Sequence, residues 1–86
     1  MEHQDQQFAK YVVESIVEYP DKVFVERSTD EQGVLITISV AQEDMSKVIG
    51  RMGNIVKAIR ILLRVVGAKN NARVSLKINE PHDKSN

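Results

Sequence analysis

The amino-acid sequence predicts an α+β fold in which the elements follow one another as α-β-β-α-α-β and the helices pack on one face of a three-stranded sheet. Residues 5–19 and 53–66 place apolar side chains at helical spacing. Residues 34–40 and 72–79 alternate apolar and polar side chains, which is the period of a half-buried strand. Between the two later helices stand two glycines three positions apart, Gly50 and Gly53.

The first predicted helix, residues 5–19, is amphipathic. Its polar side chains Lys10, Glu14 and Glu18 lie opposite an apolar face. Asp5 is the predicted N-terminal cap, and Pro20 ends the helix because the residue before a proline disfavours helical geometry. The side chains predicted to face the core are Phe8, Val12, Ile16 and Tyr19.

Two strands follow and are expected to form a hairpin. Residues 22–28 are rich in β-branched and aromatic side chains, and residues 30–33 end in Gly33, which can take the positive φ that a tight turn requires. The next strand, residues 34–40, turns one side to the core. The inward side chains are Val34, Ile36, Ile38 and Val40.

The second half of the chain contains two helices and a strand. Glu43 and Asp44 begin a short helix, where acids suit the helix dipole, and this helix stops at Gly50. The next helix continues to Val66, and Gly67 is expected to end it. Its predicted core side chains are Ile55, Ile59, Leu62 and Val66. The last strand, residues 72–79, has inward side chains Ala72, Val74, Leu76 and Ile78.

Length and composition predict one domain, residues 5–79, with a flexible segment at 1–4 and a disordered tail at 80–86. The absence of cysteine excludes a disulfide framework and fits a reducing compartment. No apolar run is long enough to cross a membrane, and residues 1–7 are polar rather than signal-like. We therefore expect a cytoplasmic protein that does not engage a membrane.

Charge is distributed unevenly, although the formal net charge is +0. Residues 1–44 hold ten acidic and three basic side chains, whereas residues 45–79 hold eight basic side chains and no acidic one. Because a polyanion responds to the local field rather than to net charge, the second half favours a polyanionic ligand. The eight bases are Lys47, Arg51, Lys57, Arg60, Arg64, Lys69, Arg73 and Lys77.

The stretch Val48-Ile49-Gly50-Arg51-Met52-Gly53, followed by helix-spaced isoleucines, resembles the KH domain, whose GXXG loop clamps a short single-stranded RNA backbone. The strand, two helices and strand of residues 34–79 match the minimal KH unit, and the added helix and strand in front of it match the type II arrangement. The chain looks like the small single-KH proteins of bacteria, the KhpA type.

This resemblance implies an RNA site around the GXXG loop. Gly53 and Asn54 open a helix, so their amides are expected to point outward unpaired and to attract phosphate. By resemblance, bases lie in a groove with Ile49 at its floor, although Ile49 is equally compatible with a plain core position. The predicted RNA-binding residues are Lys47, Ile49, Gly50, Arg51, Met52, Gly53, Asn54, Lys57, Lys69 and Arg73.

The implied function is that of an RNA-binding protein that acts as a post-transcriptional regulator or RNA chaperone. The alternative is a protein-interaction module with a KH fold and little RNA binding. Catalysis has little support, because the two histidines, His3 and His82, lie near the chain ends and there is no cysteine nucleophile. No cofactor or metal is expected.

A partner chain is also predicted, from the helix that follows Gly53. Apolar side chains cover about 220° of its circumference at 100° per residue, which is about twice the stripe that a one-sided core needs. The surplus residues are Ala58, Ile61 and Val65. We expect a homodimer packed through them, and the resemblance also implies pairing with a larger Jag-type KH protein.

Overall fold

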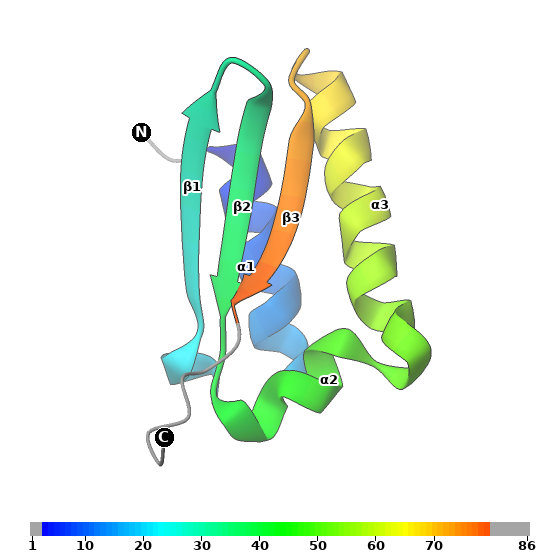
Figure 1. The fold of residues 1–86 in the computed structure, drawn as a ribbon. Helices are drawn as coiled ribbons and strands as arrows, with labels where there is room; N and C mark the ends of the chain where they lie inside the picture. Colours follow the sequence, from blue (N-terminus) through cyan, green and yellow to red (C-terminus); the bar gives the residue numbers. More distant parts are fainter. Residues whose placement is uncertain (1–2, 80–86) are drawn as a thin grey trace.

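The computed structural model describes residues 3–79 and confirms the predicted α-β-β-α-α-β order (Figure 1). The segment predicted as a disordered tail, residues 80–86, lies outside the described residues, as do residues 1 and 2. The helices and strands are α1 (Gln4–Ile16), β1 (Phe24–Asp30), β2 (Gly33–Ser39), α2 (Met45–Ile49), α3 (Asn54–Lys69) and β3 (Val74–Asn79). Three single 3₁₀ turns are η1 (Pro20–Lys22), η2 (Gln42–Asp44) and η3 (Arg51–Gly53).

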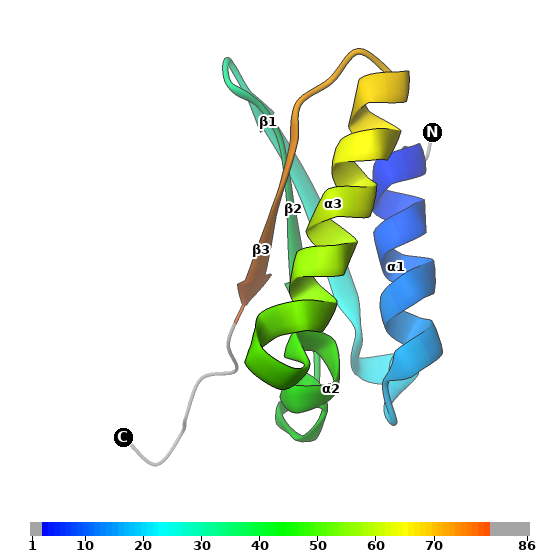
Figure 2. The same cartoon turned by 90° about the vertical axis from the view of Figure 1, so that its right-hand side faces the viewer.

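The three strands form one mixed sheet in the order β1-β2-β3. β1 and β2 make the predicted antiparallel hairpin, paired from Asp30 opposite Gly33 to Phe24 opposite Ser39. β3 runs parallel to β2, beginning with Val34 opposite Val74, because two helices carry the chain back to the starting end of the sheet. Figure 2 shows α1 and α3 side by side on one face of the sheet, with α2 below them.

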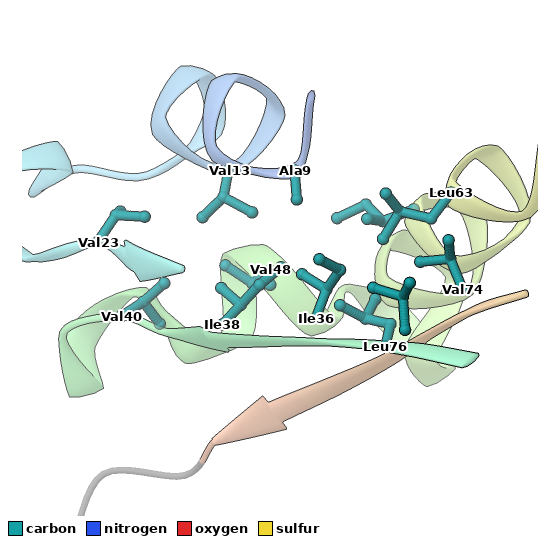
Figure 3. Packing of buried hydrophobic residues seen from close by; sticks show 12 residues of the cluster. Ala9, Val13, Val23, Ile36, Ile38, Val40, Val48, Leu63, Val74 and Leu76 are labelled. Atoms are coloured by element: carbon teal, nitrogen blue, oxygen red, sulfur yellow. The ribbon is translucent and has the colours of Figure 1, made fainter. Parts of the chain in front are cut away.

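The core lies between this sheet and the helices (Figure 3). The strand alternation predicted for β2 is confirmed, since its inward side chains are buried while the alternate ones are half-buried. Helices α1 and α3 close the core from above with small and branched side chains. The buried cluster comprises Ala9, Val13, Val23, Val34, Ile36, Ile38, Val40, Val48, Ile59, Leu63, Val74 and Leu76.

The predicted core face of α1 is partly wrong. Ala9 and Val13 are fully buried, whereas Ile16 and Tyr19 are 38% and 39% exposed. Tyr19 is exposed because α1 ends at Ile16, so the residues beyond it leave the helical phase before Pro20 begins η1. Ile16 is the last residue of α1, and the buried side of the helix is centred on Ala9 and Val13. Phe8 and Val12 pack at the margin of the core.

Asp5 does not cap α1, as the sequence predicted, because the cap position is His3. The Asp5 carboxylate is buried and accepts a hydrogen bond of 2.9 Å from Nε of Arg27 on β1. On the same helix, the Gln6 side chain donates to the carbonyl of Val25, also on β1. These contacts fix α1 to the sheet through its polar first turn as well as through its apolar face.

Helix α3 continues past Gly67, which the sequence predicted as its stop, and ends at Lys69. Gly67 is buried, and a Cβ there would lie 2.6 Å from the Ala72 carbonyl oxygen and 2.7 Å from Cγ2 of Val74. Glycine therefore serves close packing of α3 on the start of β3. The left-handed residue that turns the chain after the helix is Asn71, with φ 57°.

The predicted core face of α3 also needs one correction. Leu63 is fully buried, whereas Leu62, which was predicted to be core, is 47% exposed. Ile59 is buried as predicted, and Ile55 and Val66 are half-buried. The helix is therefore docked on the sheet with its inward face rotated toward Leu63.

Candidate nucleic-acid interface

The loop between α2 and α3 lies at the corner where the chain reverses direction (Figure 1). α2 ends at Gly50, which has φ 80° and ψ 175°, and Gly53 precedes α3 with φ 77° and ψ 16°. Between them, Met52 also has positive φ, at 55°, inside the turn η3. Three of the four loop residues thus adopt backbone conformations that favour glycine, and this allows the sharp reversal.

The two loop glycines have different surroundings. A Cβ at Gly50 would lie 2.2 Å from Cγ1 of Ile55 and 2.3 Å from Oδ1 of Asn54, so this glycine lets the loop fold against the first turn of α3. A Cβ at Gly53 would meet no atom within 4 Å. Gly50 is therefore required by the loop itself, whereas Gly53 leaves the space beside the helix end open to a ligand.

The amides at the start of α3 differ from the prediction. The N–H of Gly53 donates to the Gly50 carbonyl at 3.2 Å, and the N–H of Asn54 donates to the Arg51 carbonyl. These two groups are paired rather than free, because η3 winds the loop into helical form before α3 begins. Attraction of this end of α3 for an anion must come from the helix dipole and the neighbouring side chains.

The side chains around the loop project into solvent. Met52 is 94% exposed, and Arg51 and Asn54 are exposed beside it. Lys57, one turn into α3, is exposed as well. Ile49 at the end of α2 is half-buried, which fits both a groove floor and a core margin. The structure thus places the predicted loop residues around one open surface.

Asp44 holds two distant parts of the chain together, a role that the sequence analysis did not predict. It stands at the start of α2 but makes no capping bond there, and its side chain is fully buried. Its two carboxylate oxygens accept hydrogen bonds from the backbone N–H groups of Glu18 and Tyr19, at 2.9 and 3.0 Å. These bonds join the segment after α1 to the helix that carries the GXXG loop. No short-range pattern marks such a long-range contact.

The basic side chains of the second half are largely unpaired. Within residues 3–79, only Lys47 among the eight lies near a carboxylate, with Nζ 4.0 Å from Oδ1 of Asp44. The other seven make no ion pair in that part of the chain. Because no carboxylate of residues 3–79 pairs with these seven cations, their field is available to an external anion.

Three of the four bases on α3 share one side of the helix. At 100° per residue, Lys57, Arg60 and Arg64 fall within a sector of about 60°. Arg64 faces the start of β3, where it lines a hollow together with Arg73. Lys69, which was predicted to lie across a groove together with Arg73, is the exposed last residue of α3 and does not line this hollow. Three of the eight bases were not selected by the sequence analysis, namely Arg60, Arg64 and Lys77. Among these, Arg64 lines the hollow, and its spacing from Lys57 and Arg60 was a usable signal.

Other kinds of site are not supported in the described part of the chain. Residues 3–79 contain no cluster of three or more His, Cys, Asp or Glu side chains that could hold a metal ion. Over the same residues, every helix is too short or too polar to span a bilayer.

The fold and its loop define the class of the protein. A mixed β1-β2-β3 sheet covered on one face by helices, with a Gly-x-x-Gly turn between α2 and α3, is the architecture of a type II KH domain. The family described as KhpA/KhpB, KH domain matches residues 6–78. The chain belongs to this family, which is not an enzyme family.

The relatives match most of the chain. The RNA-binding protein KhpA of Clostridium acetobutylicum is 42% identical over 72 residues, which are 84% of this chain and 96% of the relative. The RNA-binding protein KhpA of Chlamydia pneumoniae is 38% identical over 74 residues, 86% of this chain and 95% of the relative. The protein of the same name from Listeria monocytogenes is 38% identical over 69 residues, which are 80% of this chain and 91% of the relative. No solved structure matched the chain significantly.

Proposed function

We propose that the protein binds short single-stranded RNA at its GXXG loop and acts in the cytoplasm as a post-transcriptional regulator or RNA chaperone. The observation that carries the proposal is the open space beside Gly53, which is flanked by the exposed side chains of Arg51, Asn54 and Lys57. A phosphate that approaches there meets the positive end of α3 and two cations. The relatives named RNA-binding proteins support the same ligand.

The chemistry of the surface also sets the mode of binding. Residues 41–79 contain no aromatic side chain, so no stacking platform is available near the loop. The interaction rests on backbone phosphates, with Lys47 and Lys57 one turn before and after the loop. We therefore expect modest affinity, a short footprint and weak base selectivity.

We further propose that the working form is a homodimer. The outward side of α3 exposes the apolar side chains of Ile61, Leu62 and Val65, at 52%, 47% and 61%, next to exposed Ala58. A contiguous apolar face on a single helix is self-complementary about a two-fold axis, which makes a second copy the simplest occupant. The same face could pair with a larger KH protein of the Jag type, and the family name joins KhpA with KhpB.

The alternative, an interaction module with little RNA binding, is supported by this apolar face alone. It does not account for seven basic side chains that make no ion pair within residues 3–79. RNA binding accounts for both features, because the basic and apolar sides of α3 are separate. We therefore retain RNA binding as the function and dimerisation as its context.

A pair of variants at Gly53 tests the proposal. Gly53→Asp and Gly53→Asn place side chains of nearly equal size in the same open space, and both residue types tolerate the positive φ found there. Only Asp adds a negative charge where phosphate must approach. In fluorescence anisotropy with a labelled single-stranded oligonucleotide, we expect Gly53→Asp to lose binding and Gly53→Asn to retain most of it.

Circular dichroism should show both variants folded, since no atom lies within 4 Å of the added Cβ. A folded Gly53→Asp protein with wild-type affinity would show that the loop is not the RNA site. Equal loss in both variants would assign the effect to bulk rather than to charge, and would remove the electrostatic part of the proposal.

A further inference from the structure

Among residues 3–79, two carboxylates are buried, and each lies near one end of α1. Asp5, in the first turn of α1, is 6% exposed, and Asp44, just before α2, is 0% exposed. Asp5 accepts a hydrogen bond from the Arg27 side chain, whereas Asp44 accepts hydrogen bonds from the backbone after α1. Figure 1 shows the end of α1 next to α2 and its beginning at the other end of the sheet. Only the Asp44 carboxylate therefore lies near the GXXG loop.

The Asp44 carboxylate uses both of its oxygens. Oδ1 accepts the N–H of Glu18 at 2.9 Å, and Oδ2 accepts the N–H of Tyr19 at 3.0 Å. Because α1 ends at Ile16, these two N–H groups lie beyond the hydrogen bonds of the helix. A carboxylate offers an acceptor oxygen to each of them, whereas an asparagine would turn its NH₂ group, a donor, toward one of the two N–H groups.

Helix α2 needs such a contact because it is only five residues long, from Met45 to Ile49. A helix this short is not stable through its own hydrogen bonds. Val48 is its only fully buried side chain. The backbone N–H of Asp44 also donates to the Ala41 carbonyl at 2.9 Å, so Asp44 is fixed by both its backbone and its side chain. The position of α2 thus depends on one apolar contact and on Asp44.

The GXXG loop follows directly from α2. From Asp44 to Gly50 the helical chain covers about 9 Å of axis, and the N–H of Gly50 donates to the Ser46 carbonyl at 2.8 Å. A tilt of α2 would therefore move Gly50 and the loop after it. The cation one turn before the loop is linked to the same carboxylate, because Nζ of Lys47 lies 4.0 Å from Oδ1 of Asp44.

We propose that Asp44 is a positioning residue for RNA binding. It is buried and touches no RNA, but its bonds to the backbone of Glu18 and Tyr19 hold α2, and with it the GXXG loop, in the geometry that receives a phosphate. This inference rests on the proposed function. It gives the connection between α1 and β1 a part in RNA binding, although that connection lies outside the loop and outside the basic side of α3.

Three variants of the full chain test the proposal, and two of them are matched controls. Asp44→Asn disrupts the paired acceptors. Asp5→Asn makes the same change in the other buried carboxylate, at the far end of α1, and so controls for lost stability. Glu43→Gln removes one negative charge from the exposed neighbour of Asp44 and so controls for electrostatics. Denaturant titrations identify conditions in which every variant is folded.

In fluorescence anisotropy with a labelled single-stranded oligonucleotide, we expect Asp44→Asn to bind about tenfold more weakly than the wild type, the effect of losing one hydrogen bond that orders the loop. Removal of a negative charge by itself would strengthen binding to a polyanion, so electrostatics cannot produce this loss. Asp5→Asn and Glu43→Gln should bind as tightly as the wild type or slightly more tightly.

Amide hydrogen exchange of the RNA-free protein tests the order of the loop directly. The N–H groups of Gly50 and Gly53 donate to the carbonyls of Ser46 and Gly50. In Asp44→Asn they should exchange about tenfold faster relative to the amides of β2, which report on overall stability. Asp5→Asn should leave this ratio unchanged, because its effect is on overall stability alone.

A folded Asp44→Asn protein with wild-type affinity and an unchanged exchange ratio would overturn the positioning role. Equal weakening by Asp5→Asn would overturn it as well, since affinity would then follow stability. If Gly53→Asp abolishes binding while Asp44→Asn has no effect, only the positioning role fails. If the wild type binds no oligonucleotide, the proposed function fails, and the exchange ratio decides whether Asp44 holds the loop.

A second variant applies if Asp44→Asn does not fold. Asp44→Glu keeps the charge and both acceptor oxygens but lengthens the buried side chain by one CH₂ group, so it should displace α2 and weaken binding in a folded protein. Wild-type affinity of folded Asp44→Glu would contradict the proposal, because the loop would then tolerate a displaced α2.

Discussion

The two exposed sides of α3 differ in chemistry although they belong to one helix. On one side, Lys57, Arg60 and Arg64 project as cations without ion-pair partners in residues 3–79. On the next side, about 90° around the axis, exposed apolar side chains gather around Ile61 and Val65. The third side, with Ile59 and Leu63, is buried against the sheet.

This difference shows how a small domain can present two binding surfaces. A 16-residue helix that packs one side on a three-stranded sheet leaves two sides free, and the chain uses each for a different chemistry. The basic side begins at the GXXG loop, so it suits a strand that enters there. The apolar side is exposed in the described chain, and it is suited to another helix.

The largest expected effect is on the apolar side. Ile61→Asp should dissociate the proposed dimer by at least about 100-fold, because an unpaired charge buried at the contact costs about 3–5 kcal/mol. Sedimentation equilibrium of the full chain measures this, and circular dichroism should show an intact fold, since Ile61 is 52% exposed in the single chain.

Gln32→Asp is the matched control, because it adds the same charge at the exposed hairpin turn. It should leave the dimer unchanged. A wild type that is monomeric at high micromolar concentration, or an Ile61→Asp variant that stays dimeric, would contradict the assignment of this side of α3.

The second-largest effect is on stability, and it distinguishes the buried side of α3 from its exposed apolar side. Leu63→Ala should reduce the free energy of unfolding by about 3 kcal/mol, because the side chain is fully buried in the core. Its neighbour provides the control. Leu62→Ala should change stability by about 0.5 kcal/mol or less at concentrations where the chain is monomeric. Denaturant titrations measure both, and a reversed order would mean that α3 is docked with Leu62 inward.

The smallest expected effect is on the salt dependence of RNA affinity, and it concerns the basic side of α3. Lys57→Ala should reduce the slope of log affinity against log salt by about 0.7, the contribution of one phosphate contact on a single strand. Lys10→Ala removes an exposed base from α1, away from the loop, and should leave the slope unchanged. RNA affinity that does not vary with salt in the wild type would remove the electrostatic role of this side.

Much of the architecture could be predicted from the sequence. Alternation in residues 34–40 and 72–79 predicts strands because side chains on a pleated strand point to opposite faces in turn. Gly50 and Gly53 predict the turn between two helices, because glycine adopts a positive φ readily. In the structure both residues have a positive φ. The uneven charge predicts a basic side on α3, because residues three and four positions apart lie on the same side of a helix. Lys57, Arg60 and Arg64 have this spacing.

The tertiary structure decided what local spacing leaves open. Leu62 and Leu63 are 100° apart on one helix, so either could face inward until docking on the sheet selected Leu63. The buried carboxylate of Asp44 finds its partners at Glu18 and Tyr19, a pairing that no local pattern reveals. Likewise, the hollow that joins Arg64 to Arg73 exists because α3 meets β3 at that point. The sequence by itself determined the elements, the loop and the charge, whereas contacts between distant segments decided which side of each helix is buried and which cations lie near one another.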